Sequence, residues 1–180
     1  MGSMVDLFIS ARNIMEWLAK CAAQAGESRQ PIPWITPLGL PVVQPYRSKA
    51  MKQVRTKVQH VLLVDTDGRQ VSVGRQKSAF PPNFVHSLDS THMLLTARRC
   101  LEDDGISFAA VHDSYWTHAS SVDIMNQRLR EEFVKLYEQP LLENLLLELR
   151  LRLPDMKFDV VPQVGELDLR RVLESEYFFN

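Results

Sequence analysis

The chain has 180 residues, of which 45% are hydrophobic and 24% charged, and its formal net charge is −1. These ordinary values exclude a disordered or collagen-like chain, and the length is sufficient to bury a core without disulfide or metal staples. Two cysteines exclude a disulfide framework, no apolar run approaches the roughly 20 residues that span a bilayer, and no N-terminal segment has the order of a secretory signal.

Charge is distributed unevenly along the chain. Residues 47–77 contain eight Lys and Arg against two Asp, a local charge of +6, whereas residues 123–180 contain twelve acidic and eight basic residues. A basic, strand-like segment can follow nucleic-acid phosphates by counterion release, and a merely solvated face is the alternative interpretation.

The N-terminal part of the chain is predicted to combine a helix with short strands. Apolar residues at three- and four-residue spacings predict a helix over 5–25, with Gly26 as its stop. Frequent prolines then leave room only for short strands at 34–35 and 40–43, joined by a turn. The β-rich segments 54–64 and 70–75 flank Asp67-Gly68 and predict a hairpin there.

The C-terminal part is predicted to be mainly helical. Pro81-Pro82-Asn83 opens a helix to about Leu101, and residues 106–111 and 115–117 read as two strands joined by a polar turn. Three further helix starts are predicted: a capping box at Ser120 and Asp123, Pro140 before the Leu-rich stretch 141–153, and Asp168 as the cap of a last short helix. The fold class is therefore α+β with mostly local connections.

The sequence carries no complete catalytic motif: it has no Gly-rich phosphate loop, no HExxH and no GxSxG. Five histidines, at positions 60, 86, 92, 112 and 118, lack metal-ligand spacing. His86 and His92 would lie roughly 240° apart around a helix, which makes them poor joint ligands.

Asp113 is the main candidate for chemistry, because it stands at the tip between two apolar strands. A strand this apolar is expected to be buried on both sides, so a carboxylate at its end is costly unless it is paired or binds a hard cation such as Mg²⁺. The alternative is an Asp that accepts hydrogen bonds from the backbone N–H groups of its turn. Trp17, Trp34 and Trp116 are expected in the core.

Four separated blocks resemble, in the same order, segments of the phage-type single-subunit DNA-directed RNA polymerases. Residues 108–118 (FAAVHDSYWTH) resemble the third polymerase motif, and residues 81–93 (PPNFVHSLDSTHM) resemble the helix that precedes it. Residues 34–46 (WITPLGLPVVQPY) and the ending 173–180 (LESEYFFN) match in order too. The PYR, YWTHA and YFF details are more similar to the organellar branch, so the resemblance implies a mitochondrion or plastid.

The resemblance implies a right-hand polymerase, with helices of the palm and fingers packed on a small antiparallel sheet that carries a β-hairpin insertion. Two aspartates from separate motifs bind two Mg²⁺ ions in that family, and Asp113 matches the second of them. His86 would lie against the minor groove of the RNA–DNA hybrid. The other implied site residues are His112, Ser114 and Tyr115 at nucleic acid, and Tyr177, Phe178, Phe179 and Asn180 in a C-terminal foot.

The implied partners are a DNA template, an RNA transcript, ribonucleoside triphosphates and the remainder of the catalytic domain, with no membrane. Residues 1–4 are expected to be an expression scar or the start of a gene model, and 5–180 the C-terminal catalytic segment. That segment would comprise a basic hairpin at 54–76, a strand–turn–strand unit at 106–119, and C-terminal helices with the foot at 120–180.

The chain departs from the family pattern at one point. The family's first metal-binding aspartate and its nucleotide-handling helix precede the segment that resembles residues 5–25, so this chain is expected not to polymerise by itself. Two alternatives remain: a non-catalytic nucleic-acid-binding or interaction module that uses residues 47–77, and a family A DNA polymerase fragment. The second is disfavoured because Ser114 stands where that family has Glu.

Overall fold

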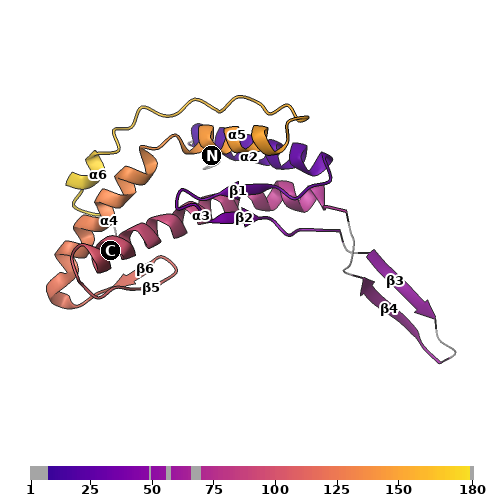
Figure 1. The fold of residues 1–180 in the computed structure, drawn as a ribbon, viewed down its shortest axis with the longest axis horizontal. Coiled ribbons are helices and arrows are strands. Elements are labelled where there is room, and N and C mark those ends of the chain that lie inside the picture. The colour runs from indigo at the N-terminus through magenta and orange to yellow at the C-terminus, as the bar shows by residue number, and fades with distance from the viewer. Residues whose placement is uncertain (1–7, 49, 56–57, 66–69, 179–180) are drawn as a thin grey trace, which may run out of the picture. The chain divides into compact units, whose positions relative to one another are not determined.

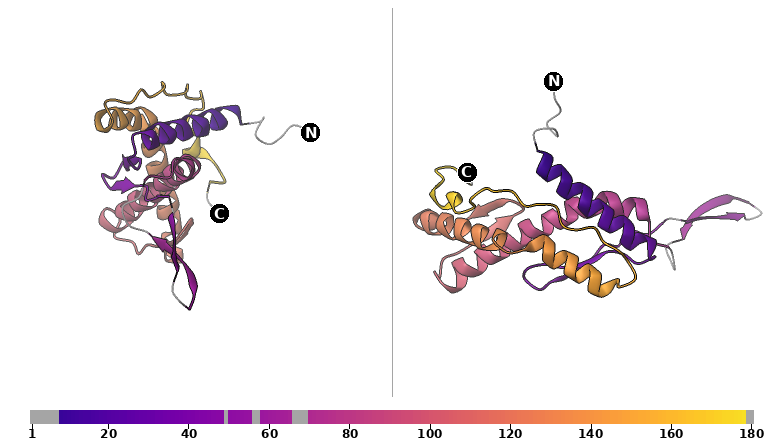
Figure 2. Two further views of the ribbon diagram at one scale, coloured as in Figure 1. Left: turned by 90° about the vertical axis from the view of Figure 1, so that its right-hand side faces the viewer. Right: turned by 90° about the horizontal axis from the view of Figure 1, so that it is seen from above.

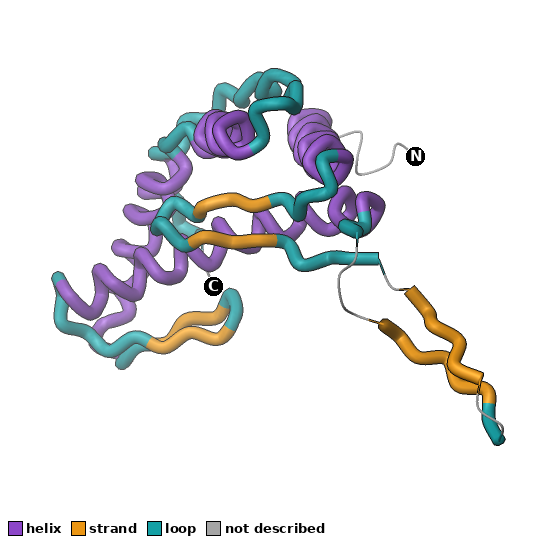
Figure 3. Tube along the Cα trace, turned by 45° about the vertical axis from the view of Figure 1, so that its right-hand side comes forward, coloured by secondary structure: helices purple, strands orange, loops and turns teal. Residues whose placement is uncertain are grey.

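The computed structural model describes residues 8–48, 50–55, 58–65 and 70–178. Its helices are α2 (Ile9–Glu27), α3 (Val73–Glu102), the 3₁₀ helix η1 (Ala119–Ser121), α4 (Val122–Tyr137), α5 (Leu141–Arg152) and α6 (Arg171–Glu174) (Figure 1). The strands form two-stranded sheets: β1 (Pro33–Ile35) with β2 (Pro41–Val43), β3 (Ala50–Arg55) with β4 (His60–Asp65), and β5 (Ala109–Val111) with β6 (Ser114–Trp116) (Figure 3). Helices with small antiparallel sheets confirm the α+β class.

The chain divides into two compact units, each of which has its own core. The first unit comprises Met1–Trp34, Val42–Pro81 and Leu149–Pro162, and the second comprises Ile35–Pro41, Pro82–Glu148 and Gln163–Asn180. No helix among the described residues is both long and apolar enough to cross a lipid bilayer.

The core of the first unit is built around α2. Its buried residues, Trp17, Leu18, Cys21, Ala22, Ala25 and Gly26, recur at helical spacing in the second half of the helix. Phe8 and Met15, which belong to the predicted apolar stripe, are exposed, so the buried face differs from the predicted one. The buried residues of α2 share this core with Ile32, Trp34, Val71, Phe80, Leu149, Leu153 and Phe158. The rings of Trp34 and Phe80 meet edge to face, with 5.3 Å between centroids. Burial raises the pKa of the Cys21 thiol to about 12, which fits an inert core cysteine.

The hairpin in the basic segment differs from the predicted one. Strand β3 pairs antiparallel with β4 in a register that runs from Ala50 opposite Asp65 to Arg55 opposite His60. The segment 54–64, predicted as one strand, therefore contains the turn, and 70–75 is not the return strand. The turn predicted at Asp67-Gly68 lies outside the described residues.

A buried pair of glutamines joins the two segments at the base of this hairpin. Gln44 Nε2 donates to the backbone oxygen of Gln76 at 3.2 Å, and Gln76 Nε2 donates to the backbone oxygens of Gln44 and Tyr46 at 3.0 and 3.3 Å. Both side chains are buried. Breaking these hydrogen bonds would leave buried polar groups unpaired, so the pair holds the hairpin base together.

Helix α3 is longer than predicted, because it begins at Val73 and not at Pro81. Pro81 and Pro82 lie inside it and contribute no N–H donor, and the division between the two units falls between them. The turns before Pro81 are mostly polar and exposed, so they have no apolar stripe from which a helix could be predicted.

In the second unit, α3 contacts α4 through His92, which meets Leu129 and Phe133, and α6 lies beside α4 (Figures 1 and 2). The buried residues of this part of α3 are Phe84, Leu88, Thr91, His92, Thr96 and Cys100, and those of α4 are Met125, Leu129, Glu132, Val134 and Leu136. The hydroxyls of Thr91 and Thr96 donate to the backbone oxygens of Ser87 and His92, so burial leaves neither hydroxyl unpaired.

An ionic cluster joins the end of α3 and the loop after it to α4. Arg128 donates to both carboxylate oxygens of Asp104 at 2.7 Å and to Glu131 at 2.8 Å. Arg99 lies 3.5 Å from Glu131 and 3.6 Å from the buried Glu132. The hydrogen bonds from Arg128 hold the pKa of Asp104 below its usual range.

At two helix N-termini the structure differs in detail from the predicted cap. Ser121, and not Ser120, precedes α4, and it makes no side-chain capping bond because η1 occupies the approach to this helix. Asp168 Oδ1 accepts a hydrogen bond from the Arg170 backbone N–H at 3.0 Å, just before α6 begins at Arg171. Pro140 precedes α5 as predicted, and its backbone oxygen accepts from Asn144.

Replacing Gln76 by Ala is expected to lower the free energy of unfolding by about 2–3 kcal/mol, because it removes hydrogen bonds to Gln44 and Tyr46 in a buried site. Urea unfolding followed by circular dichroism measures the change. Gln163→Ala, at an exposed position, is the matched control. Equal stability of the two variants would contradict the structural role of the glutamine pair.

Replacing Asp104 by Asn is expected to make the free energy of unfolding fall less steeply as the pH is lowered from 7 to 3. The folded-state pKa of Asp104 lies below its unfolded value, so its contribution is fully present above about pH 5 and is lost as the pH falls through the lowered pKa. Urea unfolding at pH 7 and at pH 3 measures the difference. Asp155→Asn, at an exposed carboxylate for which the described structure shows no ion pair, should retain the wild-type pH dependence.

Candidate functional site

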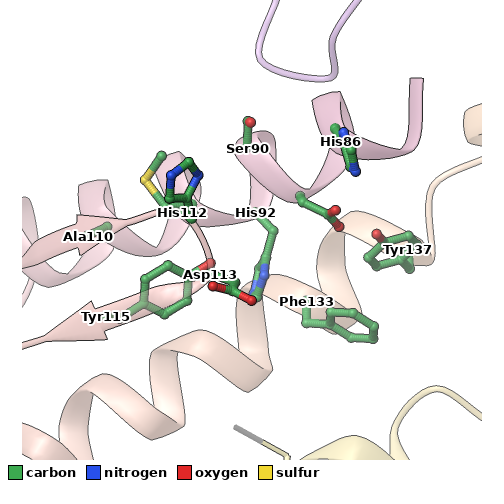
Figure 4. Close-up of a pocket in the computed structure, with 11 residues that line it drawn as sticks. His86, Ser90, His92, Ala110, His112, Asp113, Tyr115, Phe133 and Tyr137 are labelled. Carbon is green, nitrogen blue, oxygen red and sulfur yellow. The ribbon is translucent and has the colours of Figure 1, made fainter. Parts of the chain in front are cut away.

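A cavity of about 690 Å³ in the second unit brings together four of the predicted site residues, His86, His112, Asp113 and Tyr115 (Figure 4). Helix α3, the β5–β6 hairpin and α4 each supply part of its wall. The lining residues are His86, Asp89, Ser90, His92 and Met93 from α3, Ala110, His112, Asp113 and Tyr115 from the hairpin, and Phe133 and Tyr137 from α4. Two segments that are separate in sequence, 81–93 and 108–118, thus meet at one site.

The β5–β6 hairpin presents Asp113 through a two-residue turn. Val111 pairs with Ser114, which leaves His112 and Asp113 as the turn residues. His112 has a φ of 55°, in the left-handed region that is strained for a residue with a side chain. The Thr117 hydroxyl donates to the Ser107 backbone oxygen at 2.6 Å and holds the open end of the hairpin together.

The expectation that this hairpin is buried on both sides is wrong for this chain. Val111 is 59% exposed and Trp116 is 51% exposed, so Trp116 does not belong to the core, unlike Trp17 and Trp34. The physical reason is that the sheet has two strands within the described residues, and packing covers the face with Ala110 and Tyr115 more than the other. The desolvation argument for a paired or metal-bound Asp113 therefore does not hold here.

Asp113 is exposed, and its carboxylate points into the cavity (Figure 4). Among the described residues it makes no ion pair and accepts no hydrogen bond, so the alternative of an Asp that caps its own turn is not observed. The carboxylate is thus available to a ligand. The described residues contain no group of three or more His, Cys, Asp or Glu that could hold a metal ion, so Asp113 could form only part of a metal-binding site here.

His86 and His92 reach the cavity in different ways. His86 is exposed, whereas His92 is 4% exposed and its Nε2 lies 2.8 Å from the backbone oxygen of Leu129. That contact makes Nε2 the protonated nitrogen, since a carbonyl can only accept. Burial lowers the pKa of His92, so the ring is neutral near pH 7. Its position one turn beyond Leu88 on the buried face was a signal for a core histidine.

Two tyrosines and a second carboxylate complete the polar wall. Burial raises the pKa of Tyr115, and the nearby carboxylates of Asp89 and Asp113 raise it further. Burial and Asp89 likewise raise the pKa of Tyr137. Both phenols therefore remain neutral near pH 7, and the wall combines hydroxyl donors with carboxylate acceptors, a combination suited to a hydroxyl-rich ligand or a hard cation.

The sequence predictions named Tyr115 but neither Asp89 nor Tyr137. Asp89 stands one turn after His86 on α3, which was a usable signal for a shared face. Tyr137 ends α4 and had no signal of its own. Ser114 begins β6 but does not line this cavity; with Asp113 it borders a hollow of about 560 Å³ on the side of Trp116 and α4.

The C-terminal segment packs beside the cavity wall. Phe178 meets Phe133 edge to face with 4.9 Å between centroids, and Arg130 donates to the Ser175 backbone oxygen at 3.0 Å. Tyr177 is 71% exposed. Phe179 and Asn180 lie outside the described residues.

Comparisons with known proteins place these features in context. A model of the DNA-dependent RNA polymerase family matches residues 1–158. The chain is 54% identical over 175 residues to DNA-directed RNA polymerase 1, mitochondrial, of Nicotiana sylvestris, covering 97% of this chain and 17% of that protein. It is 50% identical over 180 residues to DNA-directed RNA polymerase 3, chloroplastic, of the same plant, covering 100% and 18%.

A third relative, DNA-directed RNA polymerase 2A of Nicotiana tabacum, is 50% identical over 175 residues, covering 97% of this chain and 52% of that protein. The chain therefore spans less than a fifth of the length of the first two relatives and about half the length of the third.

Replacing His112 by Val is expected to lower the free energy of unfolding by about 1–2 kcal/mol, because a β-branched residue tolerates a positive φ even less well than His. His118→Val is the matched control, since His118 has an extended backbone (φ −67°, ψ 148°). Urea unfolding of both variants measures the effect, and an equally stable pair would show that the turn is not strained.

Proposed function

Since this chain belongs to the DNA-dependent RNA polymerase family, we propose that it supplies part of the active site of an enzyme that joins ribonucleoside triphosphates on a DNA template. The observation that carries this proposal is the single cavity lined by both segments that resemble polymerase motifs, with the Asp113 carboxylate open to it. The chain would form the C-terminal part of a right-hand catalytic domain, contributing to palm and fingers.

Asp113 is proposed as the catalytic residue and as one ligand of Mg²⁺. A carboxylate oxygen is the ligand type this hard cation prefers, and the exposed turn leaves room for further ligands from outside the described residues. Two such ions in the complete enzyme would activate the RNA 3′-hydroxyl and stabilise the pyrophosphate leaving group. The remaining metal ligands and the nucleotide-handling groups would come from the rest of the catalytic domain.

Four residues at or beside the cavity are proposed to hold nucleic acid. His86 and His112 are exposed donors at the cavity, and Tyr115 offers a neutral hydroxyl and a ring for contact with sugar and base. Ser114 would contact nucleic acid from the opposite side of the turn. The C-terminal foot, Tyr177, Phe178, Phe179 and Asn180, would brace this site, as the contact of Phe178 with Phe133 supports.

The proposed location is a mitochondrion or plastid, because the relatives at 50–54% identity carry mitochondrial or chloroplastic names. The proposed partners are the DNA template, the RNA transcript, ribonucleoside triphosphates and the remainder of the polymerase. The basic hairpin region favours a second candidate function, a nucleic-acid-binding module without turnover, since residues 47–77 carry a charge of +6.

An extension assay on an RNA–DNA hybrid tests the proposal. In a complete polymerase that carries this segment, Asp113→Asn is expected to lower Mg²⁺-dependent synthesis by about a thousandfold or more, because it removes a charged metal ligand. Asp155→Asn is the matched control and should leave synthesis unchanged. This chain by itself should show no synthesis, since it holds one carboxylate of the proposed pair.

Hybrid binding separates the two candidate functions. Retained, salt-dependent binding in Asp113→Asn together with lost synthesis supports the catalytic assignment. Binding without synthesis by any protein that carries this segment, wild type included, favours the non-catalytic module.

A further inference from the structure

Three of the aromatic rings in the cavity wall, those of His92, Phe133 and Tyr137, form an aromatic cluster together with Phe178, which packs against Phe133. The proposed function gives His92 no role in this cluster. Phe133 is its centre. Its ring lies 5.5 Å from that of His92 at an interplanar angle of 79°, 4.5 Å from that of Tyr137 at 42°, and 4.9 Å from that of Phe178 at 73°. Edge-to-face pairs have a preferred geometry, so each ring restricts the orientation of the next.

The four rings stand on three segments of the second unit. His92 belongs to α3, Phe133 and Tyr137 belong to α4, and Phe178 belongs to the C-terminal segment. His92, Phe133 and Tyr137 line the cavity, whereas Phe178 borders a different hollow beside α6. Phe178 therefore touches the cavity wall without being a cavity residue, and Phe133 is the ring that connects it to the others.

Phe178 is itself held against α4. Arg130 lies one turn before Phe133 on the same helix, and its Nη2 donates to the Ser175 backbone oxygen at 3.0 Å. Its guanidinium carbon also lies 6.0 Å from the centre of the Phe178 ring, within the range of a cation–π contact. The C-terminal segment is thus attached to α4 at two successive turns, by Arg130 and by Phe133.

His92 contacts α4 at the same place. Its Nε2–H donates to the Leu129 backbone oxygen at 2.8 Å, and Leu129 lies one turn before Phe133. The imidazole is buried, so its hydrogen bond and its ring contact with Phe133 fix both its position and its tilt. His92 shares this stretch of α3 with Asp89 and Ser90, which face the cavity.

We propose that Phe133 is a positioning residue through which the C-terminal segment holds His92, and with it the cavity-facing stretch of α3, against α4. Phe178 and His92 both contact the Phe133 ring, so loss of Phe178 lets Phe133 turn and loosens the His92 hydrogen bond. The importance of this positioning role for the reaction rests on the proposed function, but the coupling between Phe178 and His92 does not.

Proton NMR of the His92 ring in this chain tests the coupling. The Nε2 proton, assigned by its loss in His92→Gln, should exchange with solvent about tenfold faster in Phe178→Leu and in Phe133→Leu than in the wild type. Phe158→Leu is the matched control: it makes the same change at a buried phenylalanine of the first unit and should leave the exchange rate unaltered.

The double variant distinguishes a relay from general loosening. If Phe178 acts through Phe133, Phe133→Leu combined with Phe178→Leu exchanges no faster than Phe133→Leu by itself. Additive effects, or an unchanged rate in Phe178→Leu, overturn the proposal.

The consequence for the reaction is measured separately. In a complete polymerase that carries this segment, Phe133→Leu and Phe178→Leu should each lower kcat about tenfold while the nucleotide KM changes by less, because positioning of the hybrid and not nucleotide capture is impaired. An unchanged kcat with a faster His92 exchange overturns the positioning role. If the wild type shows no synthesis, or if Asp113→Asn does not reduce it, the proposed function is refuted instead.

Discussion

The contact of α3 with α4 is the interaction on which the candidate site depends. At its centre a buried neutral imidazole, His92, bonds to a backbone oxygen of α4, and at its end the ionic cluster of Arg99 and Arg128 joins the same helices again. The His92 hydrogen bond tolerates little displacement because both of its partners are buried, and in the ionic cluster the Glu132 side chain is 2% exposed. Helix α3 therefore presents His86 and Asp89 from a fixed support.

Much of the fold could be predicted from the sequence, and the failures have physical reasons. The helices α2 and α4 carry an apolar stripe at helical spacing, so their existence was readable. The β3–β4 pairing was missed because VRTKVQHVLLV has no Gly or Pro to mark a turn within it, so the segment resembled one strand. The start of α3 was missed because tertiary packing of Gln76 and Phe80, and not an amphipathic pattern, supports that polar stretch.

The site was predicted mainly by resemblance to a family. The match over residues 1–158 confirms the family, and the roles of the site residues stay predictions. Asp113 and His86 stand in recognisable motifs, and the structure brings them to one cavity. Asp89, Tyr137 and Phe133 were not predicted, because their role depends on which faces of α3 and α4 meet. The prediction that the β5–β6 hairpin is buried was wrong. An apolar strand is buried on both sides only when other elements pack on both faces of its sheet, and composition does not specify that packing.

The three tryptophans lie in two different environments, so the intrinsic fluorescence of the protein can be used as a probe. Trp17 and Trp34 are 4% and 2% exposed in the core of the first unit, whereas Trp116 is 51% exposed three residues after Asp113. We therefore expect emission from the two buried indoles to be blue-shifted and shielded from acrylamide, and that of Trp116 to be red-shifted and open to quenching. The quenchable fraction of the fluorescence therefore reports on the surroundings of Asp113, without any label attached to the chain.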